Sequence, residues 1–395
     1  MERVRNSASQ GSAQTIAVAA VEFGWGSAGK LAAILGAVRG HNTQISIVGL
    51  DSRLGRPVLA GQRIGAWIES DEMSDKELSK CLRELGVRLA IVVLDPEIAV
   101  RLESLGIQVV YVDSLPFLWT GLEPIPNLVS RYCAQLCTSL PQPSWKVMRK
   151  IQSLIWVGAI VELNRTSIEE TRRGKAVINL GGLHSPLSED GNDNYLKLVM
   201  GPILKLAMQR GFEELVVTGN LDVGQLTLAY PSLNEIVVRG GRMTREEFVA
   251  EMRGAEVVFT SPGRTVLLEL ATLRQRAVIL PPQNLSQMMN AADASENVDP
   301  RIVVHWPSEM LDTAELRQHQ ALGELEGVKF IYKMIARAAI APKDLHAKLY
   351  DQFSYCLDRV LQSDIRMTPM TSMIGEDGAA DVAQVVIDLM QEVYP

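Results

Sequence analysis

Long apolar stretches, paired cysteines and an excess of positive charge are all missing from this sequence of 395 residues. No run approaches the length of a membrane-spanning helix, and the first residues lack the charged-then-apolar order of a signal peptide. The four cysteines are scattered, which argues against a disulfide framework or a zinc site. A net charge of -7 argues against general nucleic-acid binding, which normally needs a basic surface. We therefore expect a cytoplasmic protein with reduced thiols, and neither a membrane nor a nucleic acid as its partner.

Apolar runs of strand length alternate with helical patterns along the whole chain, which is typical of parallel α/β sheets. The length exceeds that of one typical core and favours two domains. The predicted strands cover residues 15–21, 44–49, 89–94 and 108–112 in the first half, and residues 176–180, 215–218, 235–239, 257–260, 277–280 and 301–304 in the second.

The segments that interrupt these runs predict the domain limits. A Pro-rich stretch at residues 140–144 indicates the end of the last helix of the first domain, and an apolar run at residues 154–160 leads into the second. The predicted parts are a disordered tail at residues 1–14, an N-terminal domain over 15–150, a second domain over 151–375 and a C-terminal helix within 376–395.

A glycine-rich loop follows the first predicted strand. Gly24, Gly26 and Gly29 have the spacing G-x-G-x-x-G, and Lys30 comes directly after them. Such a loop holds phosphates through backbone N–H groups at a helix N-terminus, and on its own it also fits a dinucleotide-dependent oxidoreductase. Lys30 could neutralise a phosphate or a carboxylate, or it could be an ordinary exposed lysine. Phe23 and Trp25 could stack on a planar ligand.

The segment over residues 257–291 carries the most specific signal in the chain. A predicted strand stops at a turn containing Ser261, Gly263, Arg264 and Thr265, and the following helical pattern carries Glu269. A strand, a Gly-containing turn and a helix N-terminus leave backbone N–H groups free for an anion. The next strand is followed by clustered amides, which are Gln283, Asn284, Gln287 and Asn290. A phosphate cradle, a ribose acceptor and sugar-reading amides in this order predict a nucleotide-sugar pocket.

This arrangement resembles the donor half of the GT-B glycosyltransferases, which have two facing Rossmann-like domains, and in particular the branch of the lipid II N-acetylglucosaminyltransferase. The resemblance implies an α/β GT-B fold with parallel sheets, an interdomain cleft and a C-terminal helix that packs back on the first domain. It implies that Ser261, Gly263 and Thr265 face the diphosphate, that Glu269 holds the ribose, and that Gln287 and Asn290 contact the sugar. Further donor-side residues would be Gly181, Gly182, His184, Arg264 and Gln283.

The first glycine loop departs from that branch. Many of its members have a histidine where this chain has Lys30, so the acceptor must be deprotonated by another group. Glu22 is the first candidate for this general base and Asp113 the second, because both follow predicted strands at the end where ligands bind. The sequence contains no Asp-x-Asp element of the metal-dependent transferases, and we expect neither a metal nor a cofactor.

The stretch over residues 18–31 is also similar to the N-terminal signature of the cytosylglucuronate and hydroxymethylcytosylglucuronate synthases of nucleoside antibiotic biosynthesis. That resemblance implies inverting transfer of glucuronic acid from UDP-glucuronate to N1 of cytosine or hydroxymethylcytosine, with Arg264, Lys30 or His184 pairing with the donor carboxylate. A homodimer is possible. Three alternatives stay open, which are another GT-B glycosyltransferase of secondary metabolism, a UDP-sugar hydrolase of the same architecture, and a protein that only binds the nucleotide.

Overall fold

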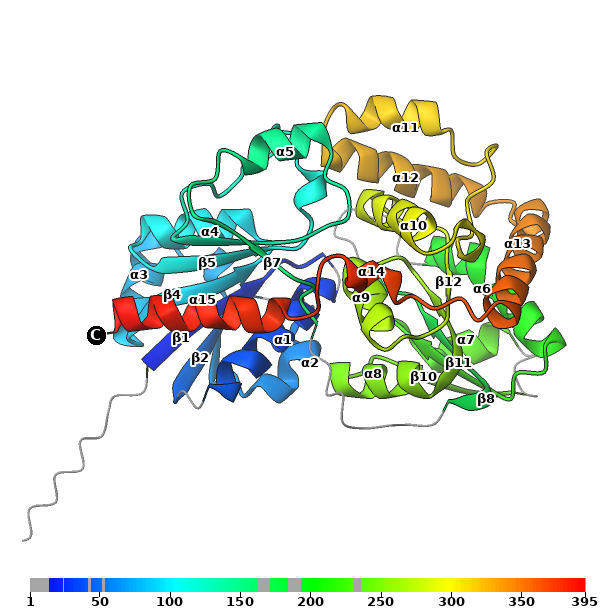
Figure 1. Cartoon of the computed structure of the whole chain (residues 1–395), viewed down its shortest axis with the longest axis horizontal. Coiled ribbons are helices and arrows are strands. Elements are labelled where there is room, and N and C mark those ends of the chain that lie inside the picture. The colour runs from blue at the N-terminus through cyan, green and yellow to red at the C-terminus, as the bar shows by residue number, and fades with distance from the viewer. Residues whose placement is uncertain are drawn as a thin grey trace, which may run out of the picture.

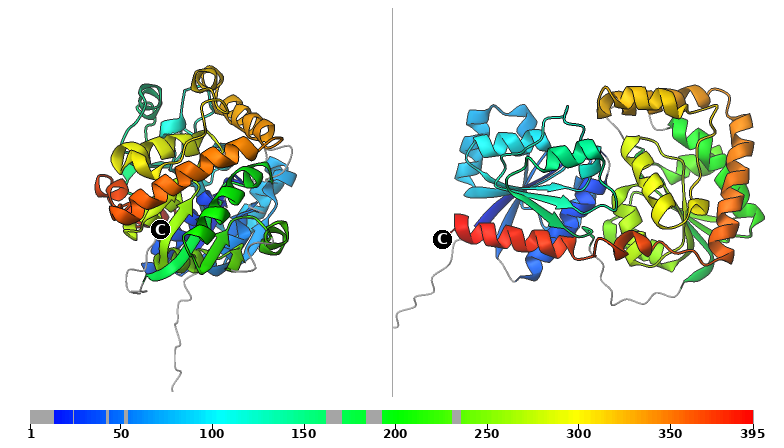
Figure 2. Two further views of the ribbon diagram at one scale, coloured as in Figure 1. Left: turned by 90° about the vertical axis from the view of Figure 1, so that its right-hand side faces the viewer. Right: turned by 45° about the horizontal axis from the view of Figure 1, so that its top comes forward.

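Two parallel α/β sheets lie side by side in a computed structural model of the chain (Figure 1). The structure describes residues 14–23, 25–41, 44–51, 54–161, 171–183, 193–230 and 236–394. The two layered units, each with helices against its sheet, confirm the α/β fold class expected from the alternating sequence pattern (Figures 1 and 2).

The first sheet has seven strands in the order β3-β2-β1-β4-β5-β6-β7. All of its strand pairs are parallel. The strands are β1 (Gln14–Ala20), β2 (Ile45–Leu50), β3 (Ala66–Ile68), β4 (Val87–Val93), β5 (Gln108–Asp113), β6 (Arg131–Gln135) and β7 (Leu154–Val157). Strands of a parallel sheet are buried on both faces, which is why these runs are nearly continuous apolar sequence rather than alternating.

Alternation within each strand divides the core of this unit into two clusters. Ile16 and Val18 of β1 face a cluster that includes α1 (Gly26–Gly40) and α15 (Gly378–Val393), whereas Ala17 and Ala19 face α3 (Asp75–Glu84) and α4 (Pro96–Ser104). The C-terminal helix α15 therefore packs on the first sheet beside α1, far from its neighbours in sequence (Figure 1).

The second sheet has five parallel strands in the order β10-β9-β8-β11-β12. Its strands are β8 (Arg172–Asn179), β9 (Glu214–Thr218), β10 (Val237–Gly241), β11 (Ala255–Thr260) and β12 (Ala277–Ile279). Its longer helices are α6 (Asp193–Gln209), α8 (Arg245–Gly254), α9 (Arg264–Thr272), α10 (Leu285–Asn297), α12 (Glu324–Ala338) and α13 (Lys343–Gln362). One continuous apolar core joins this sheet to its helices.

The shorter elements connect these layers. They are α2 (Arg56–Leu59), α5 (Gln142–Met148), α7 (Val223–Ala229), α11 (Thr313–Gln320), α14 (Pro369–Ser372) and the 3-10 turns Ala60–Gln62, Ser70–Glu72, Pro116–Leu118 and Pro300–Ile302. No helix in the described part of the chain is long and apolar enough to span a membrane.

Three local expectations from the sequence are wrong. Residues 301–304 form a 3-10 turn and a single bridge from Val303 to Ile279, because Pro300 and the Asp299 cap favour a turn over a strand. The Pro-rich stretch at 140–144 precedes and begins helix α5 rather than ending a helix, since proline suits the first turn. Finally, Leu154–Val157 is the edge strand β7 of the first sheet, so this sheet extends beyond residue 150.

Candidate active site between the two sheets

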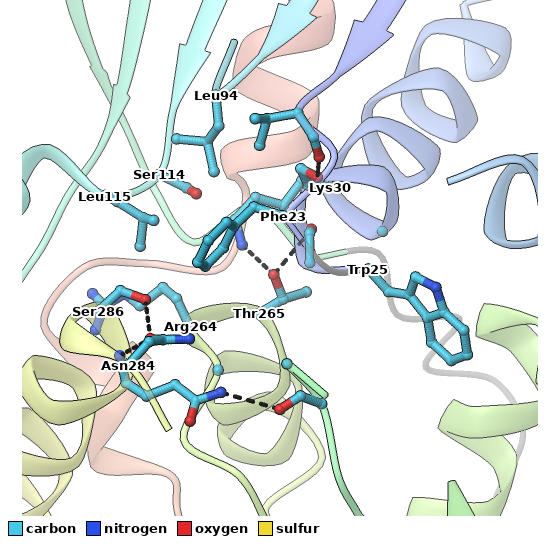
Figure 3. Close-up of a pocket in the computed structure, with 18 of the residues that line it drawn as sticks. Phe23, Trp25, Lys30, Leu94, Ser114, Leu115, Arg264, Thr265, Asn284 and Ser286 are labelled. Carbon is cyan, nitrogen blue, oxygen red and sulfur yellow. Dashed lines mark hydrogen bonds between the residues drawn. The ribbon is translucent and has the colours of Figure 1, made fainter. Parts of the chain in front are cut away.

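A cavity of about 650 Å³ lies between the C-terminal ends of the two sheets, and both units line it (Figure 3). From the first unit come the loop after β1, the start of α1 and the segment after β5. From the second come the turn after β8, the start of α9 and the start of α10. This is the edge where ligands bind in parallel α/β sheets.

Most of the site residues expected from the sequence line this one cavity. They are Phe23, Trp25, Gly26, Lys30, Asp113, Gly181, Gly182, Gly263, Arg264, Thr265, Glu269, Gln287 and Asn290. Glu22, Ser261 and Gln283 are not among its lining residues. Gly24 and His184 lie outside the described residues.

The two glycine turns meet where α1 and α9 begin. The Lys30 ammonium donates to the Thr265 hydroxyl, and that hydroxyl donates to the Gly26 carbonyl at 3.2 Å (Figure 3). Neither helix has a side-chain cap or an acidic residue in its first turn, whereas the neighbouring helix α8 has a complete capping box from Thr244 and Glu247. Two uncapped helix N-termini therefore face each other and leave backbone N–H groups available to an anion.

Lys30 is buried rather than exposed, with 1% of its surface accessible. Burial lowers its pKa to about 7, because the charged ammonium loses hydration; Glu269 opposes this shift, and Arg264 and Arg245 add to it. An amine that is only partly protonated near neutral pH regains its full charge when an anion binds beside it. The alternative interpretation of Lys30 as an ordinary surface lysine is therefore wrong.

Two arginines at this junction are paired with carboxylates. Arg245 forms an ion pair with Glu269 at 3.0 Å, and both side chains are nearly inaccessible. Arg264 forms an ion pair with Asp293 of α10 at 2.5 Å and donates to the Leu136 carbonyl of the first unit at 3.3 Å. Together with Lys30, these residues form a cluster with three basic and two acidic side chains, which we name the donor-side cluster.

The amides expected to read the sugar hydrogen-bond to backbone groups of two turns in this structure. Gln283 and Gln287 both donate to the Gly181 carbonyl at 3.1 Å, and Gln287 also accepts from the Gln283 N–H at 2.8 Å. Asn290 donates to the Pro262 carbonyl at 3.0 Å, while its own carbonyl oxygen is buried without a partner among the described residues. These bonds fix the shape of the two turns on which the donor side is built. Ser261, behind them, accepts from Gln283 at 3.1 Å.

The two candidate bases have different surroundings. Asp113 is fully buried, and its carboxylate accepts from the Leu115 N–H at 2.8 Å, the Trp119 indole at 2.6 Å and the Tyr132 hydroxyl at 2.8 Å. Burial raises its pKa, although these bonds oppose the shift. Glu22 is exposed beside the cavity and accepts from the Leu54 N–H at 3.2 Å.

An apolar wall forms the first-unit side of the cavity, and the sequence-based site residues include only Phe23 from it. Its other members are Val58, Leu94, Leu115, Leu118, Trp119 and Pro124. Figure 3 shows Phe23, Leu94 and Leu115 together on this side, with Trp25 apart from them. Leu115 and Trp119 lie in the segment after β5, so the rule that ligands bind at strand C-terminal ends could have found them. No sequence signal pointed to Glu324 of α12, which also lines the cavity.

No family model matches this chain, and no curated protein matches its sequence. Solved structures match its fold over almost their whole length. A UDP-GlcNAc 2-epimerase from Methanocaldococcus jannaschii is 12% identical with a TM-score of 0.55, covering 96% of this chain and 99% of its own. A UDP-glucosyltransferase from Polygonum tinctorium is 11% identical with a TM-score of 0.52, covering 97% and 99%. MurG from Acinetobacter baumannii is 12% identical with a TM-score of 0.50, covering 96% and 99%. The chain therefore has the GT-B fold.

Proposed function

We propose that this chain is a glycosyltransferase that uses a UDP-sugar donor. The observation that carries the proposal is one cavity with two chemically different sides. Uncapped helix N-termini and the donor-side cluster lie on one side, and an apolar wall lies on the other. The first side suits a diphosphate, and the second suits an uncharged acceptor with apolar faces.

The donor side supports a nucleotide sugar in several ways. The Gly263–Thr265 turn and the start of α9 would hold the diphosphate, and the single excess positive charge of the donor-side cluster would offset part of its negative charge. Glu269 lies one turn into α9 and is paired with Arg245. Its carboxylate would keep this ion pair and also accept hydrogen bonds from the ribose hydroxyls. Solved structures of this fold with UDP or a UDP-sugar bound support UDP as the nucleotide.

We propose UDP-glucuronate as the particular donor. Lys30 hydrogen-bonds only to Thr265 among the described residues and faces the cavity at the meeting point of the two turns. A carboxylate on the sugar would add a second anion beside this buried amine and stabilise its charge further, whereas a neutral sugar would add no such interaction. The donor preference would then arise from Lys30, which stands where many members of the lipid II branch have a histidine.

We propose cytosine or hydroxymethylcytosine as the acceptor. Its flat ring would lie against Phe23 and Trp119, with N1 directed at the anomeric carbon. In the reaction, the N1 proton passes to a base and the N1–C1 bond forms. The C1–O bond to the β-phosphate breaks, and its electron pair leaves with UDP. An α-linked donor would give a β-product by this single inverting displacement, without a bound metal or a covalent intermediate.

A second candidate function is conversion of a UDP-sugar without an acceptor, by hydrolysis or epimerisation. The fold similarity to UDP-GlcNAc 2-epimerases favours it. The apolar wall argues against it, because a reaction with water or within the sugar involves no second substrate that would occupy a large apolar subsite beside the donor turn.

The test is UDP release from UDP-glucuronate with and without cytosine, followed by mass analysis of the products. UDP that forms only with cytosine, together with a cytosine–glucuronate adduct, is the expected result. Equal UDP release without cytosine, with free sugar, would move the chain to the hydrolases. A new UDP-sugar isomer would move it to the epimerases.

A further inference from the structure

We propose that Glu324, the first residue of α12, is the base that takes the proton from the acceptor, and that the acceptor is a neutral, flat molecule with a weakly acidic N–H or O–H. This inference rests on the proposed transferase function and deepens it. It assigns the proton acceptor to the second unit, whereas the sequence-based candidates Glu22 and Asp113 both lie in the first.

Among the carboxylates that line the cavity within the described residues, only Glu97 and Glu324 have neither a hydrogen bond nor an ion pair, and Glu97 is exposed to solvent whereas Glu324 is half-buried. Asp113 accepts three hydrogen bonds, Glu269 is paired with Arg245, and Glu123 accepts from Thr120 and Gly121. Within the described residues, Glu324 makes no hydrogen bond and no ion pair, although it is half-buried at the cavity wall. A carboxylate that is already paired is a poor proton acceptor, so Glu324 is the best-placed group for this step.

The surroundings of Glu324 give it a high proton affinity. Burial raises its pKa to about 7, and the facing carboxylates Glu123 and Asp113 add to the shift. The Tyr111 hydroxyl also lies in its field, and on its own helix Glu326 is paired with Lys329 at 3.0 Å. The N-terminus of α12 favours the ionised carboxylate and limits the shift. A base with a pKa close to neutral combines ionisation with proton affinity, which is the condition for efficient general base catalysis.

The position of Glu324 defines the acceptor class. Leu325 and Val328 of the same helix line the cavity, as do Leu118, Trp119 and Pro124 of the first unit. Three acidic side chains border this region, and they would repel an anionic acceptor. An apolar slot beside a half-buried, unpartnered carboxylate therefore fits a neutral planar molecule that becomes nucleophilic only as its proton leaves.

The proton balance of the step is complete. The acceptor N–H or O–H proton moves to a carboxylate oxygen of Glu324, and the released lone pair attacks the anomeric carbon. The bond from that carbon to the β-phosphate oxygen breaks, and UDP takes the electron pair. Protonated Glu324 then returns its proton to water after product release.

The experiment compares cytosine with 5-fluorocytosine, whose ring N–H is more acidic, in the wild-type protein, Glu324→Gln and the control Glu326→Gln. We expect Glu324→Gln to lower kcat/KM for cytosine by about 10²- to 10⁴-fold, as for loss of a general base. The loss for 5-fluorocytosine should be smaller, and UDP affinity should be unchanged. Glu326→Gln, on the same helix but outside the cavity, should resemble the wild type. In Glu324→Ala, added formate should restore part of the activity.

Each result bears on one of the two proposals. Equal losses for both acceptors, or wild-type activity in Glu324→Gln, would overturn the base role of Glu324 and leave the transferase function standing. Transfer by Glu324→Ala that formate does not improve would also count against it. If the wild-type protein transfers sugar to neither pyrimidine, the proposed function fails, and the role of Glu324 fails with it.

Discussion

The two sides of the cavity differ in charge and in how their charged groups are paired. On the donor side, Arg245 and Arg264 are each matched by a carboxylate, and Lys30 is the cation in excess. On the acceptor side, Asp113 and Glu123 are held by hydrogen-bond donors of their own unit, and Glu324 is the half-buried acid without a partner among the described residues. Each side thus has one group whose charge is removed from water without being offset by an opposite charge, which is energetically unfavourable.

This difference indicates how a transferase of this fold would separate its two tasks. The excess cation is ready for an anion that arrives with the donor, and the unpartnered acid is ready for a proton that arrives with the acceptor. On the donor side the two ion pairs cancel the charges of both arginines, which limits the cost of burying them.

Removing the excess cation should produce the largest effect on the donor side of the cavity. In Lys30→Met we expect kcat/KM to fall by about 10²- to 10³-fold, because one preorganised charge at the diphosphate or the sugar carboxylate is lost. Steady-state kinetics with UDP-glucuronate and UDP-glucose measure this change. A similar loss with both donors would assign Lys30 to the phosphates, and a loss confined to UDP-glucuronate would assign it to the sugar carboxylate. Unchanged kinetics would contradict either role.

The same substitution should increase the free energy of unfolding of the protein without ligand, and the size of this increase should depend on pH. The unfolded chain binds the Lys30 proton more tightly than the folded protein does, so the wild-type free energy of unfolding rises with pH between about 7 and 10.5. The free energy of unfolding of Lys30→Met lacks this pH-dependent contribution. Its advantage in thermal unfolding should therefore be greatest near pH 7 and below and should shrink as the pH rises, with an upper bound of about 5 kcal/mol.

A smaller effect is expected on the acceptor side from Asp113→Asn. Asp113 is bonded to Trp119, which lines the cavity, and to Tyr132 beneath it. Loss of the charged acceptor should cost about 1 to 3 kcal/mol of stability and raise the acceptor KM about tenfold, while the donor KM stays the same. Trp119→Phe, which keeps an aromatic ring but removes the indole N–H and part of the ring, is the control. If Asp113 is instead the base, kcat itself should collapse and recover with 5-fluorocytosine.

The sequence predicted the donor side better than the acceptor side for a physical reason. Donor-side residues such as Gly263, Thr265 and Glu269 belong to one strand–turn–helix unit, where spacing along the chain determines position in space. Glu324 reaches the cavity because α12 packs above α10, and no local pattern encodes that tertiary contact. The hydrogen-bond partners of the side chains could not be predicted from the sequence either. Gln287 and Asn290 are at the predicted places, but they donate to backbone carbonyls.

The smallest effect is expected from Gln287→Ala, which addresses these amides. The substitution removes the hydrogen bonds to the Gly181 carbonyl and the Gln283 N–H at a residue of which only 4% of the surface is accessible. We expect a loss of about 1 to 3 kcal/mol in thermal unfolding and less than a tenfold rise in the donor KM. The decisive measurement is the ratio of kcat/KM for UDP-glucuronate to that for UDP-glucose. An unchanged ratio means that Gln287 acts by shaping the turn, because a distorted turn affects both donors alike. A changed ratio means that its amide leaves the Gly181 carbonyl on donor binding and contacts the sugar directly.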